Sequence, residues 1–374
     1  MASLARRNLF HDRVRLLVTL TGIVFSVVLA TIQLGLFVGF QTATADVIDN
    51  SRADLWVVSQ NVGHLEAGVP FSERKLYQIK SVPGVAAVEK QIVQFGDWKL
   101  PNGAVEGILL VGFNPAGEMG GPWQITAGSV ADLRSADTVM IDELYREKLG
   151  VTRLGQQVEI RGVRARVVGF TRGIRTFTTS PATFTSFKNA QNYYGLREDQ
   201  TIYLLVKAAP GVDPEELRER LAARLTDVDV YTRDEWSRKQ QFYWMFGTGA
   251  GVTVLIAAAL GLLVGVVVVA QTIYAATVDH IREYGTLKAM GATNGYIYRV
   301  IVKQAVISAL IGYGVGIGVS LLVSYVSRQG TTAVRVPWPL AVGLFFATLL
   351  MCVGASVVSI NKVTRLDPAM VFKG

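Results

Sequence analysis

Four long stretches of the chain carry no charged residue: 16–40, 247–277, 304–327 and 336–361. A helix of about 20 apolar residues crosses the hydrocarbon core of a bilayer and satisfies its own backbone hydrogen bonds there. Half of the 374 residues are apolar and the mean hydropathy is +0.34, and this surplus is concentrated in the four stretches. The pattern predicts four transmembrane helices. Four buried helices of a large soluble core are the alternative.

The first apolar stretch has features of a secretory signal, because basic residues precede it and the small-residue triplet 43–45 follows it. A signal peptide, however, has an apolar region of about 7–15 residues. The stretch 16–40 is longer than that. We therefore expect an uncleaved membrane anchor.

Lysine and arginine flank the four stretches unevenly, and the cytoplasmic flanks of membrane helices are the ones enriched in these residues. Most lie in the N-terminal segment, between the second and third stretches, and in the tail: Arg6, Arg7, Arg13, Arg15, Arg282, Lys288, Arg299, Lys303, Lys362, Arg365 and Lys373. The connection between the third and fourth stretches carries only Arg328 and Arg335. We expect both termini in the cytoplasm of a bacterium, the chain in its plasma (inner) membrane, and residues 41–246 outside.

The expected fold is an integral membrane α-helical protein with four transmembrane helices and a large α+β extracytoplasmic (periplasmic) domain between the first and second. The segments, in order, are a cytoplasmic N-terminal segment (1–15), transmembrane helix 1 and stalk (16–45), the extracytoplasmic domain (46–240), transmembrane helix 2 (241–277), a cytoplasmic loop (278–296), transmembrane helix 3 (297–327), a short outer loop (328–336), transmembrane helix 4 (337–361) and a cytoplasmic tail (362–374).

Strand-like and helix-like segments alternate in the outer domain. Strands are expected at 54–59, 85–93, 158–160, 165–170, 201–207 and 228–231. One helix is predicted over 72–80 with Ser72 as its N-cap, and another over 213–225 with Asp213 as its N-cap and Pro214 at its first position. The second helix and its flanking strands form a predicted β-α-β unit.

Two polar segments next to the first and second spans, 46–52 and 233–244, are expected to continue these spans outward as helices. A helix transmits a displacement that a glycine-rich linker would absorb. The outer domain is therefore expected to be connected rigidly to the membrane.

The third apolar stretch is rich in glycine, with Gly312, Gly314, Gly316 and Gly318 at alternate positions. Glycines four residues apart allow helix backbones to approach closely in lipid. We expect a helix-packing or dimer interface at these four residues. General glycine enrichment of membrane helices is the alternative.

The sequence offers little for catalysis. Its three histidines, His11, His64 and His280, form no pair with metal-ligand spacing, and His64 is expected to be a solvated loop residue. No G-x-x-x-x-G-K-[ST] loop is present to hold ATP phosphates. The net charge of +8 comes without a basic stripe for nucleic acid. We expect no enzyme activity, no metal and no nucleic-acid partner, and a driving force that comes from another subunit.

Three segments carry a family resemblance. They are LARRNLFHDRVRLLVTLTGIVFSVV (4–28), REYGTLKAMGATNGYIYRVIVKQAVI (282–307) and ASVVSINKVTRLDPAMVFKG (355–374). Together with the order of spans and outer domain they resemble the MacB/FtsX-type ABC transporter permeases. The segment PFSERKLYQIKSVPGVAAVEK (70–90) is most similar to DevC-like export permeases.

This resemblance implies a coupling helix in the loop between the second and third spans, which docks on a separate ATPase. The implied coupling residues are Glu283, Tyr284, Gly285, Leu287, Lys288, Ala289, Met290, Gly291 and Ala292. It also implies two ATPase copies that bind ATP and magnesium, no cofactor in this chain, and a second permease copy or a paralogue. Movement of the spans and stalks would change the shape of the outer domains, a mechanism called mechanotransmission.

The resemblance favours export or extraction of a lipid, glycolipid, lipoprotein or amphipathic compound. The expected partners are then a periplasmic adaptor, an outer-membrane channel and membrane lipid. The first alternative is an FtsX-like signalling permease that activates a cell-wall hydrolase without transporting anything. The second is a membrane receptor or scaffold without an ATPase, against which the coupling motif argues.

Overall fold

The computed structural model describes residues 13–176, 180–279, 286, 290, 292–327, 330 and 334–364. The chain divides into two compact units. The first comprises Met1–Val38, Val252–Ser327 and Ala333–Gly374, and the second comprises Gly39–Gly251 and Arg328–Thr332.

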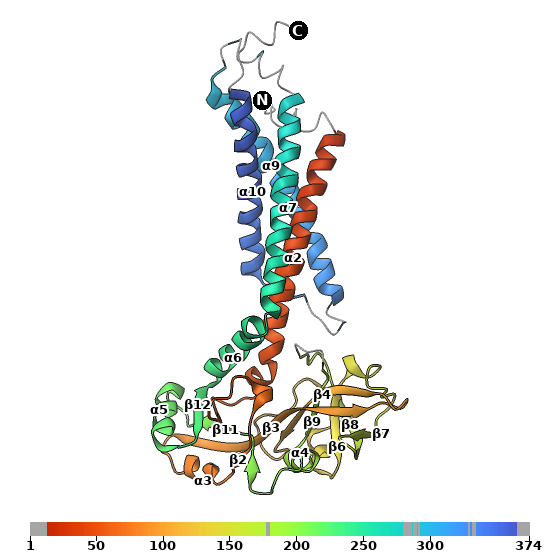
Figure 1. Cartoon of the computed structure of the whole chain (residues 1–374), viewed down its shortest axis with the longest axis vertical. Helices are drawn as coiled ribbons and strands as arrows, with labels where there is room; N and C mark the ends of the chain where they lie inside the picture. Colours follow the sequence, from red (N-terminus) through yellow and green to blue (C-terminus); the bar gives the residue numbers. More distant parts are fainter. Residues whose placement is uncertain are drawn as a thin grey trace. The chain divides into compact units, whose positions relative to one another are not determined.

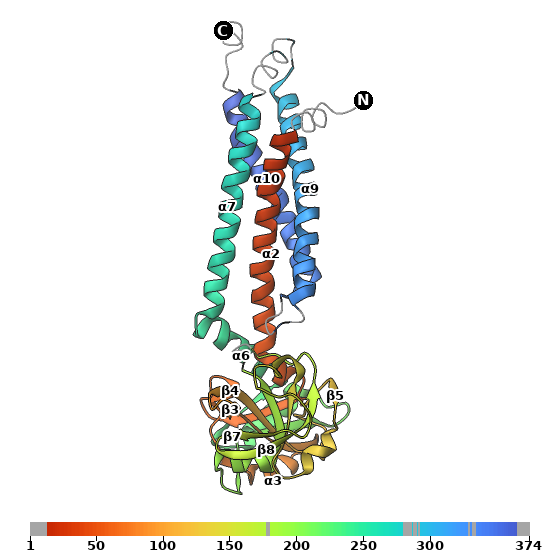
Figure 2. The ribbon, with the colours of Figure 1, turned by 90° about the vertical axis from the view of Figure 1, so that its right-hand side faces the viewer.

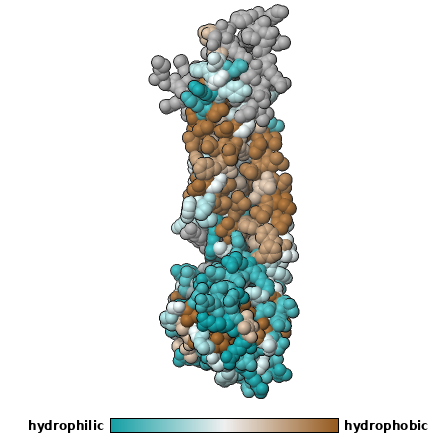
Figure 3. Space-filling view, turned by 90° about the vertical axis from the view of Figure 1, so that its left-hand side faces the viewer, coloured by the Kyte–Doolittle hydropathy of each residue, from teal (hydrophilic) through white to brown (hydrophobic). Residues whose placement is uncertain are grey.

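The first unit is a bundle of long apolar helices (Figures 1 and 2). The helices are α2 (Arg13–Asp49), α7 (Ala250–Asp279), α9 (Asn294–Ser327) and α10 (Trp338–Thr364). Each is long and apolar enough to cross a membrane. Figure 3 shows one face of these helices, which is mainly hydrophobic, as expected for side chains that face lipid tails. The prediction of four transmembrane helices is confirmed in these terms.

All four helices contribute to the interior of the bundle. Ile23 and Val27 of α2 pack with Val269 of α7, and Ala305 of α9 and Cys352 of α10 complete the same buried cluster. Small side chains are frequent in this cluster, which lets the helix backbones approach closely.

The second unit contains a ten-stranded sheet in which β3 (Val85–Lys99) belongs to two lobes. In the first lobe the strand order is β12-β1-β11-β3, and all neighbours are antiparallel. Its other elements are β1 (Leu55–Ser59), α3 (Lys75–Lys80), β11 (Tyr203–Ala208), α5 (Pro214–Arg224) and β12 (Val228–Thr232). Two split β-α-β units interleave, which is the ferredoxin-like arrangement.

The two helices of this lobe cover one face of its sheet. Ile79 of α3 and Leu217 and Leu221 of α5 are fully buried against Leu55 and Leu204 of the strands. The opposite face buries Trp56 against Trp236 of α6 (Arg233–Phe242).

The second lobe is a small closed barrel. Its strands pair in the ring β3-β4-β9-β6-β8-β7, and β7 closes the ring on β3 at Trp98↔Ile160. The added strands are β4 (Val105–Phe113), β6 (Thr138–Asp142), β7 (Gln157–Ile160), β8 (Val163–Thr171) and β9 (Ala182–Ser186). Closure leaves these strands no free ladder edge along the ring, which removes a template for unwanted pairing.

Smaller elements complete the outer domain. They are η1 (Leu65–Ala67), β2 (Phe71–Ser72), β5 (Ile125–Ala127), η2 (Val130–Arg134), η3 (Glu143–Tyr145), α4 (Phe187–Tyr194) and β10 (Gln200–Thr201). β5 pairs antiparallel with the end of β8, and β2 pairs with β10 in a separate two-stranded sheet. The expected α+β domain between the first and second spans is confirmed.

The two predicted helix starts have different outcomes. For α5 the prediction is confirmed, because the Asp213 side chain accepts from the Glu215 N–H and Pro214 occupies the first turn. For α3 it is wrong, because the helix begins at Lys75 and Ser72 does not cap it. Ser72 instead pairs with Gln200 in the β2-β10 sheet, so its backbone is extended.

The two expected helical stalks also differ. Helix α2 continues without interruption to Asp49. The second connection is not one continuous helix, which corrects the expectation. After α6 the chain forms a π-helical turn, η4 (Tyr243–Gly247), and Gly249 has a φ of 77° before α7 begins. Glycine adopts this left-handed conformation at low cost, so the helix is interrupted there.

Candidate functional site

Most of the predicted coupling residues lie outside the described residues: Glu283, Tyr284, Gly285, Leu287, Lys288, Ala289 and Gly291. Met290 and Ala292 are described. The Met290 N–H donates to the Thr286 carbonyl (3.0 Å), and the Met290 residue is 71% exposed. An exposed methionine provides an adaptable apolar contact for another protein. The coupling role stays a prediction.

The four glycines of α9 fall on two faces of the helix. A Cβ on Gly312 would lie 2.5 Å from Ile23 of α2, and one on Gly316 would lie 2.8 Å from Val27. At Gly314 and Gly318 a Cβ would have nothing within 4 Å. Gly312 and Gly316 therefore lie against α2 inside the chain, whereas Gly314 and Gly318 face away from it.

Helix α7 also approaches α2 through glycine. A Cβ on Gly261 would lie 2.7 Å from Leu29, and one on Gly265 would collide with Ser26. Gly22 of α2 has the matching relation to Val268, at 2.5 Å. Two helices of the bundle thus contact α2 at distances that side chains would prevent.

A buried polar cluster connects α2 and α6 within the outer domain. Gln240 of α6 is fully buried, and both ends of its amide are bonded. Its Nε2 donates to the Thr44 carbonyl in α2 (3.1 Å) and to the Glu66 carboxylate (3.0 Å). Its Oε1 accepts from the Leu65 N–H (2.7 Å). One side chain therefore connects two helices and the η1 turn.

Glu66 gathers further contacts at the same place. Trp244 Nε1 donates to its carboxylate (3.2 Å), and His64 Nδ1 lies 3.0 Å from it. The His64 ring stacks on Tyr243, with ring centroids 4.0 Å apart and planes 16° apart. Bonds to a charged acceptor are stronger than those between neutral groups. We call Thr44, His64, Leu65, Glu66, Gln240 and Trp244 the stalk junction.

Residues next to the stalk junction form further hydrogen bonds. The Tyr203 hydroxyl donates to the Leu65 carbonyl, and burial raises the pKa of this phenol well above its usual value. Gln41 Nε2 donates to Gln241 Oε1 (3.1 Å), which is a second link between α2 and α6. The η1 turn, α2 and α6 are thus fixed to one another by several independent contacts.

No local sequence pattern predicts this site. His64 was expected to be solvated, but its side chain is only 19% exposed and is held between Glu66 and an aromatic ring. Gln240 and Glu66 are 174 positions apart, so no local pattern connects them. Within the described part of the chain, no group of three His, Cys, Asp or Glu side chains could hold a metal ion.

The architecture defines a membrane protein whose outer domain is inserted between its first two spans and whose first span continues into that domain. A family model for the MacB-like periplasmic core domain matches residues 16–224, and one for the FtsX-like permease C-terminal region matches residues 255–368. The chain belongs to the MacB/FtsX-type family of ABC transporter permeases. The family resemblance found in the sequence is confirmed.

Individual relatives are distant in sequence. An uncharacterised ABC transporter permease of Mycobacterium tuberculosis is 24% identical over 375 residues, which cover 99% of each chain. The macrolide export ATP-binding/permease protein MacB of Escherichia coli is 24% identical over 253 residues, which are 64% of this chain and 39% of MacB. The solved periplasmic region of MacB from Actinobacillus actinomycetemcomitans has a TM-score of 0.36 and 13% identity, covering 50% of this chain and 92% of that one.

Proposed function

We propose that this chain is the membrane subunit that transmits the work of a separate ATPase to an outer domain, and that it thereby exports or extracts a lipid, glycolipid, lipoprotein or other amphipathic compound. The observation that carries this proposal is the uninterrupted helix α2, which runs from Arg13 to Asp49. Its last turns bury Val47 and Ile48 in the core of the outer domain. The stalk junction then holds this end of the helix against α6.

Family membership implies an ATPase partner and a dimeric permease. In the proposed machine two ATPase copies bind ATP and magnesium at the cytoplasmic face, where both termini of this chain lie. The positions of lysine and arginine support this orientation in the inner membrane. A second copy or a paralogue completes the permease, and a periplasmic adaptor and an outer-membrane channel receive the cargo.

The partners test the proposed function directly. Gentle purification of the chain from its native membrane, followed by mass spectrometry, is expected to recover an ATPase and a periplasmic adaptor. Recovery of an ATPase with a cell-wall hydrolase would favour the FtsX-like signalling alternative. Recovery without any ATPase, under conditions that preserve other ABC complexes, would contradict the proposal.

The coupling residues give a first mutational prediction. Met290→Asp places a charge on an exposed apolar side chain, so the amount of ATPase that co-purifies is expected to fall about tenfold, which corresponds to about 1.4 kcal/mol. Asn294→Asp is the control, because it adds the same charge at the first residue of α9, where an acid is favourable. Full ATPase association of the Met290 variant, at equal membrane insertion, would remove Met290 from the docking surface.

Helix α6 gives a second prediction. Inserting two glycines after Arg238 interrupts α6, so we expect ATP hydrolysis to continue while the outer domain stops responding to ATP. The same insertion after Gly249 is the control and is expected to have a smaller effect, because the helix is already interrupted there.

The response can be measured by fluorescence. The chain has a single cysteine, Cys352, which is buried, so a label can be directed to Asn102→Cys in the exposed β3-β4 turn. An unchanged ATP-dependent signal in the Arg238 insertion variant would contradict transmission through α6.

A further inference from the structure

A groove in the outer domain lies between the ferredoxin-like lobe and the barrel. Its volume is about 740 Å³. One wall comes from α3 and β3 and the other from α4, the end of η2 and the loop that follows β4. The volume is in the range of sites that hold a small molecule, and a site on both lobes is a typical place for one.

Positive charge dominates the groove. Four basic side chains line it, Lys80, Lys90, Arg134 and Lys188, against the two carboxylates of Glu89 and Glu198. The Glu89 carboxylate is already engaged by the Glu118 N–H (3.0 Å), and burial raises its pKa.

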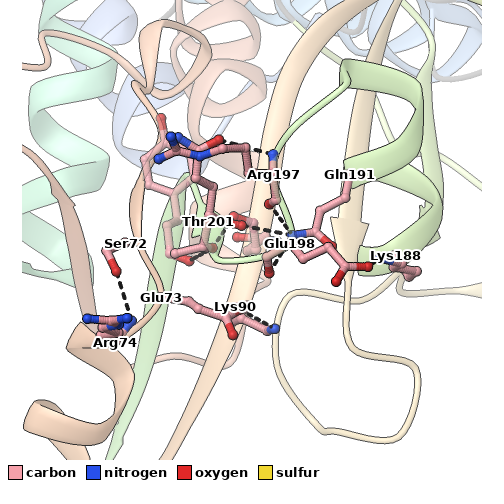
Figure 4. Close-up of polar contacts among 12 residues, drawn as sticks. Ser72, Glu73, Arg74, Lys90, Lys188, Gln191, Arg197, Glu198 and Thr201 are labelled. Atoms are coloured by element: carbon pink, nitrogen blue, oxygen red, sulfur yellow. Dashed lines mark hydrogen bonds and ion pairs between the residues drawn. The ribbon is translucent and has the colours of Figure 1, made fainter.

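Two of the basic side chains have protein partners. Lys90 Nζ lies 2.7 Å from Glu73 and sits 4.6 Å from the centre of the Phe187 ring, so it is held in place. Lys188 pairs with Glu198 at 2.9 Å, but the Glu198 side chain is 91% exposed. Exposed ion pairs of this kind contribute little to stability, so an anionic ligand can replace Glu198 as the partner of Lys188 at a small cost in free energy. Figure 4 shows Lys90 and Lys188 reaching from β3 and α4 to these carboxylates.

The other two cations are available. Lys80 at the end of α3 and Arg134 at the end of η2 are exposed, and neither forms an ion pair with any residue that the structure describes. They come from opposite walls of the groove. An anionic group between them would gain charge-assisted hydrogen bonds from both lobes.

Apolar residues also line the groove, beside the polar side chains of Asn114, Ser186 and Gln191. Leu76 and Val88 contribute one side, and Pro115, Ala116 and the Phe187 ring contribute the other. These surfaces can cover a hydrocarbon chain but cannot satisfy a polar one. The groove therefore combines a basic rim with a lining that is apolar in part.

We infer that this groove binds an anionic amphiphile, a molecule with one phosphate or carboxylate group and a short apolar chain. The anion lies between Lys80, Arg134 and Lys188, and the chain lies along the more accessible Leu76, Pro115 and Ala116. A concave site of this size suits a small molecule better than a protein partner, whose interface would cover about 800 Å² per side. Treating the ligand as cargo rests on the proposed export function, whereas binding itself does not.

The test uses the full chain in nanodiscs of zwitterionic lipid and isothermal titration calorimetry. The probe is dihexanoyl phosphatidic acid, kept below its micelle concentration. We expect saturable binding that is roughly tenfold tighter than that of dihexanoyl phosphatidylcholine, because the zwitterion weakens the contact with the basic rim. Inorganic phosphate is expected to bind at least tenfold more weakly than the lipid, since it leaves the apolar lining empty.

The double variant Lys80→Glu/Arg134→Glu is expected to lose at least tenfold in affinity for phosphatidic acid. The control Arg153→Glu/Arg224→Glu makes the same charge change at two exposed arginines that do not line the groove, and it should bind like the original chain. Equal affinity for phosphatidylcholine, equal affinity for free phosphate, or unchanged binding by the groove variant would each overturn the inference. Retention of an acidic partner protein through these residues, without lipid binding, would overturn it as well.

The assay contains no ATPase and no adaptor. If the groove variant loses lipid binding but still associates with the ATPase, the result supports lipid binding in the groove and does not affect the proposed permease function. If the original chain binds no lipid but still associates with its ATPase, only the inference about the groove is contradicted.

Discussion

Gly312→Val is expected to destabilise the helical bundle strongly, whereas Gly314→Val, two residues along the same helix, is expected to have little effect. A Cβ at Gly312 would lie 2.5 Å from the Ile23 side chain of α2. Because this is closer than two carbon atoms can approach, Ile23 or one of the two helices would have to move. Overpacking of this kind costs about 1–3 kcal/mol. At Gly314 the added side chain meets no atom of the chain within 4 Å.

Thermal unfolding of the two variants in detergent measures this difference directly. Both carry the same substitution in α9, so the β-branched side chain costs each the same helix propensity. A lower unfolding temperature for Gly314→Val than for Gly312→Val in the purified chain would contradict the packing geometry. If Gly314→Val instead keeps its stability but loses self-association, the outward glycine face is a contact between copies.

Gln240→Leu is expected to separate ATP hydrolysis from movement of the outer domain. Leucine fills most of the space of glutamine but forms no hydrogen bond, so the buried Leu65 N–H loses its partner and the Thr44 carbonyl loses its link to α6. Each buried polar group left unpaired costs about 1–3 kcal/mol. The end of α2 would then lose its Gln240 link to α6 and the η1 turn and would keep the Gln41–Gln241 bond to α6.

The same label at Asn102→Cys reports the result. In Gln240→Leu the ATP-dependent signal is expected to be lost while the ATPase rate of the complex remains. Gln78→Leu is the matched control, since Gln78 is an exposed helical glutamine of α3 and its loss should change neither quantity. A normal signal from Gln240→Leu would show that the stalk junction does not transmit force.

The parts of the fold that sequence predicts well are those encoded by neighbouring residues. The four spans can be predicted from the sequence because each lacks charged residues over the full length of a membrane-crossing helix. Few other structures require such a long stretch without charge. The helix α5 is visible because Asp213 and Pro214 act within one turn of it. Ser72 shows the limit of the same reasoning, because its pairing with Gln200 outweighs a good local capping position.

The parts that sequence does not predict depend on contacts between distant segments. The barrel closes through two residue pairs between β3 and β7, and no turn motif in the sequence predicts this pairing. The stalk junction joins Gln240 to Thr44 and Glu66, which are more distant in the chain than any local pattern reaches. None of the three residues belongs to a sequence motif. The interruption at Gly249 is not predicted either, because a polar helical segment followed by an apolar one has the same pattern as one continuous helix.

Strand β3 has a consequence for how the outer domain can move. Its first half, Val85–Gln91, is bonded to β11 in one lobe, and its second half, Ile92–Lys99, is bonded to β4 in the other. The lobes cannot turn about a flexible hinge, because any rotation between them has to bend this strand or open its ladder. The outer domain therefore has few internal degrees of freedom, and we expect the space between its two lobes to keep a nearly constant width.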